Sequence, residues 1–164
     1  MKKSFLPGRV SILCVLASAF LLTGCATPIV TQTSQDRRAV DAAIASEAPG
    51  NYYIGYRLYK VDYKMWGWVK KPGETWKQAQ LVMFNEQKVL APDRALNAIG
   101  SDNNYEYRLD GYFSGDKVYE PASDTVYPEF VLTKATVIST HPPLIYPDVR
   151  WIDPTIRLIA PPQY

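Results

Sequence analysis

Thiols and imidazoles are scarce in this sequence, and this scarcity limits the chemistry that it can perform. The 164 residues include two cysteines, Cys14 and Cys25, and a single histidine, His141. A Ser-His or Cys-His nucleophile pair would need His141, which directly precedes two prolines and is more simply interpreted as an exposed residue at a domain edge. Zinc needs three or four Cys, His or carboxylate ligands, and the sequence has neither such a cluster nor a Gly-rich phosphate loop. We therefore expect no catalytic residues, no metal and no cofactor, in a protein that is not an enzyme.

The first apolar run is too short to span a bilayer. It covers residues 10–22, which is 13 residues, whereas a transmembrane helix needs about 20. Lys2, Lys3 and Arg9 precede it. A basic start followed by a short apolar stretch is typical of a secretory signal peptide rather than of a membrane span.

The residues Leu22-Thr23-Gly24-Cys25 follow this run and resemble the lipobox of bacterial lipoproteins. In that family the cysteine thiol receives a diacylglycerol, the leader is removed before it, and the new amine is acylated, for example with palmitate. The resemblance implies that residues 1–24 are a lipoprotein signal peptide and that Cys25 carries an effectively permanent lipid anchor. Ala26 stands where an Asp would retain such proteins in the inner membrane of enteric bacteria, so the resemblance implies the outer membrane. The alternative is an ordinary signal peptide that ends near Cys25.

Without this leader, the sequence has no excess of basic residues. The whole sequence has 18 basic and 16 acidic residues, but three basic residues and no acidic ones lie within residues 1–24, so the rest carries a side-chain charge of −1. Nucleic-acid binding therefore lacks its main electrostatic argument. With Cys14 removed and Cys25 lipidated, the mature chain would have no disulfide. Its packing would depend on aromatic side chains, of which the sequence has 4 Trp and 12 Tyr.

Residues 25–50 are expected to form the lipidated cysteine, a small polar tether and a short helix. The helix is predicted over residues 34–48, and the Pro-Gly pair that follows ends it. Its apolar residues fall on one face: Ala39, Val40, Ala43 and Ile44. Because this face is narrow, we expect the helix to dock weakly, or only on the folded domain.

Residues 51–140 have the alternation and the turn residues of a β-domain. Strands are predicted over residues 52–61, 63–71, 78–87, 103–113 and 127–139, with a shorter candidate at 117–121. A brief helix with an Asp93 cap and a Gly100 stop is predicted before the strand at 103–113. This order predicts a mainly β fold, a small antiparallel barrel or sandwich, and an OB-like barrel is one candidate.

The strand at residues 103–113 has the clearest pattern, and it is expected to be half-buried. Its apolar side chains alternate with polar ones, so Glu106 and Asp110 are expected on the solvent face. Residues 114–116 are predicted to form the turn that ends it. Together with Asp102, these two acids are the best case for a hydrolase that needs paired carboxylates, but a charge-balanced outer face explains them without catalysis.

Trp66 and Trp68 are candidate contacts for a ligand or a partner. Two residues apart on a strand, they would share a face with Lys70, and an exposed pair could stack on a glycan. Core packing is the simpler alternative, because a domain without disulfides needs buried aromatic area. Gly67 between them indicates that another backbone or a ligand approaches closely.

The last segment, residues 141–164, contains six of the 13 prolines and many apolar residues. Proline excludes a helix, and disordered tails lack such apolar content. We therefore expect an extended Pro-rich tail. It would pack either against its own domain or against a partner protein of the envelope, and Trp151 is the candidate contact.

The order of lipobox, β-domain and Pro-rich tail is similar to that of the starvation-inducible outer-membrane lipoproteins of the Slp type, with the likeness centred on the segments YRLDGYFSGD and YPEFVL. The leading hypothesis is a non-enzymatic lipoprotein of the outer membrane, with a periplasm-facing β-domain that serves as an envelope structural or adaptor subunit. The alternative is a module that binds a glycan or another small ligand.

Overall fold

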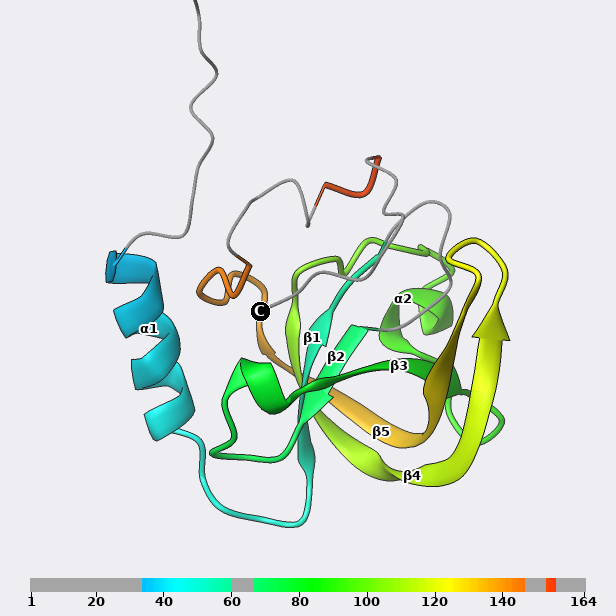
Figure 1. Ribbon diagram of the computed structural model, residues 1–164, viewed down its shortest axis with the longest axis horizontal. Helices are drawn as coiled ribbons and strands as arrows, with labels where there is room; N and C mark the ends of the chain where they lie inside the picture. The colour runs from blue at the N-terminus through cyan, green and yellow to red at the C-terminus, as the bar shows by residue number, and fades with distance from the viewer. Residues whose placement is uncertain (1–33, 60–66, 147–152, 156–164) are drawn as a thin grey trace, which may run out of the picture.

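The computed structural model describes residues 34–59, 67–146 and 153–155, and Figure 1 shows their arrangement. β-strands dominate this part of the chain. In chain order the elements are α1 (Ser34–Ala45), β1 (Tyr53–Arg57), β2 (Gly67–Lys70), the 3-10 helix η1 (Trp76–Gln78), β3 (Gln80–Asn85), α2 (Pro92–Ala95), β4 (Glu106–Glu120) and β5 (Thr125–Ser139). The expected mainly β class is confirmed.

The five strands close into one barrel in the order β1-β2-β3-β5-β4, and β4 pairs with β1 to complete the ring. The pairs are antiparallel except that of β3 with β5, which is parallel and corrects the purely antiparallel expectation. α2 lies between β3 and β4 in the chain. A small barrel is therefore confirmed over a sandwich, and its five strands with one inserted helix agree with the OB-like candidate.

β4 and β5 are longer than the sequence pattern predicts. The predicted turn at residues 114–116 is wrong, because β4 continues through it and its register with β5 shifts between Phe113 and Lys117. Gly115 has φ +91° at this point. The irregularity is a bulge, which bends a strand without ending it. The chain turns instead at residues 121–124.

The barrel interior is filled by apolar side chains from neighbouring strands and from Ala91, which precedes α2. Its buried members are Val69, Val82, Ala91, Tyr107, Leu109, Phe130 and Leu132. The Phe130 ring meets the Tyr53 ring edge-on with centroids 5.0 Å apart, and the Phe113 ring at 5.3 Å. Edge-to-face pairs of this kind add to the stabilisation that burial provides. The predicted inward side of β4 is confirmed for Tyr107 and Leu109.

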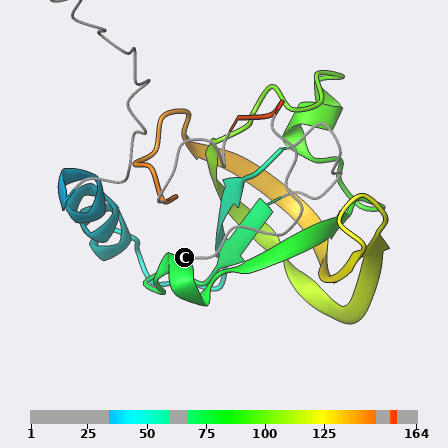
Figure 2. The same ribbon diagram turned by 45° about the horizontal axis from the view of Figure 1, so that its top comes forward.

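A second apolar layer covers the outer face of the barrel. Because side chains alternate along a strand, Trp68 points away from its interior neighbour Val69 and joins this outer layer. The buried members of the outer layer are Tyr52, Ile54, Tyr56, Leu58, Trp68, Trp76, Leu81, Tyr127, Ile145 and Tyr146. α1 and the segment after β5 lie on the same side of the barrel in both views, and they cover this layer (Figure 1, Figure 2).

α1 contacts the outer layer through the narrow face that the sequence predicts. Val40 and Ile44 pack against the layer and are partly buried, whereas Ala39 is exposed. The helix ends at Ala45 rather than at residue 48. Within the described ranges, no helix combines the length and the apolar composition that a membrane span requires.

Candidate functional site

The structure describes only one of the three candidate contact tryptophans. Trp66 and Trp151 lie outside the described residues. Trp68 is 8 % exposed and belongs to the outer apolar layer. Its ring is therefore not available as an exposed platform, and core packing accounts for it.

Gly67 is close to another backbone, which is one of the two alternatives that its position suggests. Its φ is +148°, in the region that favours glycine. A Cβ at this position would lie 2.6 Å from the backbone nitrogen of Leu58. The neighbouring strand, and not a ligand, therefore explains the glycine.

A buried ionic cluster ties the segment between β3 and β4 to β1. Arg57, the last residue of β1, is 4 % exposed. Its Nη2 donates to Asp93 Oδ2 at 2.6 Å, and its Nε donates to Asp102 Oδ1 at 3.2 Å. The Tyr107 hydroxyl donates to Asp102 Oδ2 at 2.9 Å. We define these four residues as the Arg57 cluster.

Asp93 does not have its predicted role. The predicted helix is shorter, Pro92–Ala95, and its N-cap is Ala91. The Asp93 side chain is fully buried and accepts hydrogen bonds from Arg57 and, at 3.0 Å, from the backbone nitrogen of Gly100. The acid therefore holds the loop against the barrel instead of capping a helix.

Burial dominates the electrostatics of the Arg57 cluster. It raises the pKa of Asp102, and the charge of Arg57 opposes this shift. Burial also raises the pKa of Tyr107, and the charge of Asp102 adds to the increase. The Tyr107 hydroxyl thus keeps its proton and remains a donor. The charged groups satisfy one another, so this cluster is built to hold the fold together.

A second buried ion pair joins β2 to the residues after α1. Lys70 is 2 % exposed, and its Nζ lies 2.6 Å from both carboxylate oxygens of Glu47. The backbone nitrogen of Gly73 donates to Glu47 at 2.7 Å, and the Lys70 Nζ lies 5.0 Å from the centroid of the Trp76 ring. Lys70 does share a strand face with Trp68, but this face is buried.

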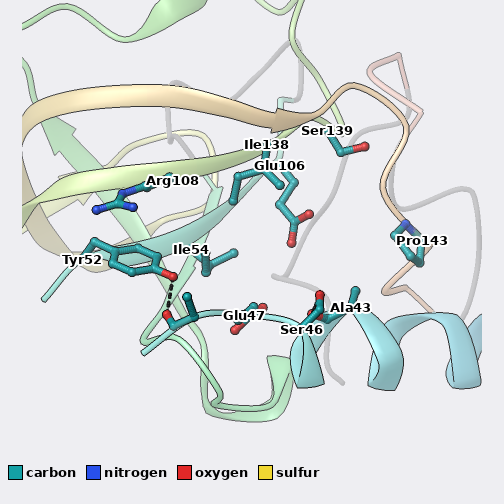
Figure 3. A pocket seen from close by; sticks show the side chains of 11 residues that line it. Ala43, Ser46, Glu47, Tyr52, Ile54, Glu106, Arg108, Ile138, Ser139 and Pro143 are labelled. Carbon is teal, nitrogen blue, oxygen red and sulfur yellow. Dashed lines mark hydrogen bonds between the residues drawn. The ribbon is translucent and has the colours of Figure 1, made fainter. Parts of the chain in front are cut away.

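A pocket of about 450 Å³ lies between the C-terminal end of α1 and the barrel (Figure 3). Its larger apolar and charged lining residues are Glu47, Tyr52, Ile54, Glu106, Arg108 and Ile138. The Arg108 guanidinium lies over the Tyr52 ring, 4.1 Å from its centroid. The Tyr52 hydroxyl donates to the carbonyl oxygen of Ala48. These contacts fix the aromatic wall of the pocket.

The structure corrects the predicted place of Glu106. It is 9 % exposed rather than on a solvent face, and its side chain points into the pocket (Figure 3). No hydrogen bond or ion pair to its carboxylate is found in the part of the chain that the structure describes. Burial, and next the charge of Glu47, raises the pKa of Glu106, while Lys70 lowers it.

The three acids of the hydrolase hypothesis do not form one site. Asp102 belongs to the Arg57 cluster, and Glu106 faces the pocket. Asp110 is partly exposed and does not line that pocket. The described residues also hold no group of three or more His, Cys, Asp or Glu side chains that could bind a metal ion. Asp102, Glu106 and Asp110 therefore do not provide the paired carboxylates that this hypothesis needs.

The sequence analysis missed the buried charges Glu47, Arg57 and Lys70. A signal was present for two of them, because Arg57 ends the short strand YIGYR and Lys70 ends GWVK. A charge in a buried strand needs a partner. The partners lie 23, 36 and 45 positions away in the chain, and a single sequence gives no way to couple residues so far apart.

Several exposed apolar residues flank α2 and the β4–β5 turn in the chain. We define the distal apolar surface as five of them: Leu90, Leu96, Ile99, Tyr119 and Val126. α2 and the β4–β5 turn, which carry or flank these residues, both lie opposite α1 (Figure 1, Figure 2). Leu96 is 75 % exposed and Ile99 is 65 % exposed. Contiguous exposed apolar patches often mark interaction sites, so Leu96 and Ile99, which lie close together in the chain, are the residues to test.

Comparison with known proteins adds no functional assignment. No protein family, no curated protein and no solved structure matches this chain.

Proposed function

We propose that this protein is a non-enzymatic lipoprotein of the bacterial outer membrane whose periplasm-facing barrel serves as a structural or adaptor subunit of the envelope. The observation that carries the proposal is the sequence Leu22-Thr23-Gly24-Cys25 after a basic, apolar leader. A lipid on Cys25 would anchor the chain effectively permanently.

The shape of the barrel supports an adaptor role. The tether would lead into α1, on one side of the barrel, and the distal apolar surface lies on the opposite side (Figure 1). A partner protein could therefore reach this surface without competing with the lipid anchor. Leu96 and Ile99 are its most exposed members.

The first residues of the C-terminal tail pack on their own domain rather than being free for a partner. Ile145 is 6 % exposed and Tyr146 is fully buried in the outer layer. Their neighbour Leu144 is partly buried against the same layer. We therefore place the partner contact on the distal apolar surface, and not on residues 144–146.

The glycan alternative has less support. OB-like barrels bind oligosaccharides and oligonucleotides on the face of β2 and β3. Here that face carries Trp68 and Leu81, which are buried in the outer layer together with Ile145 and Tyr146. A ligand on this face would have to displace the chain itself.

Photo-crosslinking in living cells tests the adaptor role. A photoreactive amino acid at position 96 or 99 should capture one discrete envelope protein, and Leu96→Asp in the position-99 variant should abolish the product. The same photoreactive residue at Ala39, which is exposed on α1, is the matched control. Equal capture from position 39, or no product from positions 96 and 99, would refute the proposal.

A further inference from the structure

The pocket beside α1 has the size and walls of a small-ligand site. Its volume of about 450 Å³ falls within the range of roughly 300–1,000 Å³ found for ligand pockets. Ile54, Ile138 and the ring of Tyr52 give it apolar walls, and Glu106 supplies a polar group (Figure 3). Apolar walls with few polar groups are typical of sites for small organic ligands.

Glu106 is the group in this pocket that needs a partner. Its side chain is nine-tenths buried and aimed into the cavity, and the described residues provide it with no hydrogen bond or ion pair. Burial removes most of the water around this carboxylate and so disfavours its charged form, although its oxygens keep some contact with solvent. A bound cation would supply the missing partner.

Neither nearby cation forms an ion pair with Glu106 in the described part of the chain, although the charge of Lys70 lowers its pKa. The Lys70 Nζ is engaged by both oxygens of Glu47 at 2.6 Å. The Arg108 guanidinium lies over the Tyr52 ring, and its end points away from the Glu106 carboxylate (Figure 3). Among the described residues, the Glu106 carboxylate therefore has no direct cationic contact.

The end of α1 adds to this negative character. Its last turn consists of alanine and isoleucine with no basic residue, so no side chain offsets the partial negative charge of a helix C-terminus. Ala43 and Ser46 from this end line the pocket. Glu47 accepts three hydrogen bonds, and a carboxylate has about four acceptor positions. One acceptor position of Glu47 thus remains for a ligand.

We propose that this pocket binds a small alkylammonium ion, with the ammonium group at Glu106 and Glu47 and the alkyl chain against Ile54, Tyr52 and Ile138. An ammonium group has three donors that suit two carboxylates and a neighbouring hydroxyl or carbonyl oxygen. A metal ion fits less well, since the described residues offer no cluster of three acidic, His or Cys ligands. The inference does not depend on the proposed adaptor role.

Calorimetric titration of the full-length protein in detergent tests this inference. Pentylamine should bind saturably, and pentanol, its neutral counterpart of similar size, should not. Glu106→Gln keeps the shape of the side chain and removes its charge, so it should weaken pentylamine binding by roughly 10- to 100-fold. Asp110→Asn removes a carboxylate of the same strand outside the pocket and should leave binding unchanged.

The alkylammonium group could come from a free amine or from a lysine side chain of a peptide. A capped peptide with one lysine, compared with the same peptide containing norleucine, separates these sources. Binding of pentylamine alone identifies a free amine, and lysine-dependent peptide binding identifies a peptide. Circular dichroism must show that both variants are folded. The proposal is overturned if no amine or lysine peptide binds, or if a ligand binds Glu106→Gln as tightly as the unchanged protein.

Discussion

Arg57 ends a strand of otherwise uncharged residues, and its guanidinium reaches two carboxylates in a segment far along the chain. Removing one partner from a buried ion pair leaves an uncompensated buried charge. The stability lost in this way exceeds the net stabilisation that the intact pair provides. The fold therefore depends on Arg57 because Asp93 and Asp102 are already buried beside it. The same reasoning applies to Lys70 and Glu47.

We predict that Arg57→Leu lowers the free energy of unfolding by about 3–5 kcal/mol, because it leaves two buried acids without their cation. The matched control is Arg94→Leu, which breaks the pair of Arg94 with Glu86, where the Arg94 side chain is 50 % exposed. An exposed pair of this kind contributes about 1 kcal/mol or less. Urea denaturation of both variants makes the comparison, and equal losses would contradict the role of the Arg57 cluster.

We expect the opposite effect for Glu106, because the described residues provide its carboxylate with no hydrogen bond or ion pair that a substitution could remove. Its pKa is raised by burial and by Glu47, so the folded protein binds more protons than the unfolded chain between the usual and the raised pKa. The free energy of unfolding therefore falls as the pH rises through this window.

Glu106→Gln should consequently raise the free energy of unfolding at pH 7 by roughly 1 kcal/mol or more and flatten its fall across this window. Thermal or urea unfolding measured over a series of pH values checks both effects. Asp110→Asn is the control, since Asp110 is partly exposed. A less stable Glu106→Gln protein at pH 7 would show that the carboxylate is stabilised in the fold.

At the scale of elements, the strand positions were predictable and their ends were not. Alternation identified the inward side of β4, since Tyr107 and Leu109 are buried as expected. The Ser-Gly-Asp sequence at residues 114–116 has the composition of a turn, yet it forms a bulge within β4. Local composition cannot distinguish the two, because a glycine with positive φ can serve either a bulge or a turn. Pairing with β5 decides the outcome.

The close contact of β2 with β1 gives a prediction for Gly67. We expect Gly67→Ala to destabilise by more than about 3 kcal/mol, because strain from φ adds to a clash with backbone. Gly115→Ala is the control, with φ +91° but no atom within 4 Å of the new Cβ, and should cost about 1–2 kcal/mol from φ strain alone. Urea midpoints distinguish them, and a mild Gly67→Ala effect would mean that β1 can move away.

The segment after β5 is an element of the core rather than a loose tail. The Tyr146 ring lies edge-on to the Tyr56 ring, with centroids 5.8 Å apart. Tyr146→Ala should cost about 3–5 kcal/mol, as large-to-small changes of buried aromatics do. Pro154→Ala, at an exposed described position, should be neutral. If differential scanning calorimetry finds equal melting temperatures for the two variants, residues 144–146 are not part of the core.

At the scale of the whole molecule, the barrel has apolar side chains on two faces of the same strands. The interior holds residues such as Val69, and the outer layer holds Trp68, the residue directly before it in the chain. The sequence predicted a barrel or sandwich, and its aromatic content indicated packing without disulfides. It could not predict the pocket, because Glu47, Ile54, Glu106 and Ile138 come from four separate segments. Only the closed fold brings them together.

The proposed adaptor role depends on where the molecule is anchored. The proposed role of this barrel as an adaptor in the envelope requires that Cys25 carries lipid. The resemblance of Leu22-Thr23-Gly24-Cys25 to a lipobox predicts this modification, and the proposed position of the partner surface depends on it.

Mass spectrometry of the native protein isolated from bacterial membranes tests this claim most directly. We predict an N-terminal peptide that starts at Cys25 and carries the added mass of a diacylglycerol and an amide-linked acyl chain. A chain that starts at Cys25 with an unmodified thiol, or one that retains residues 1–24, would contradict the account.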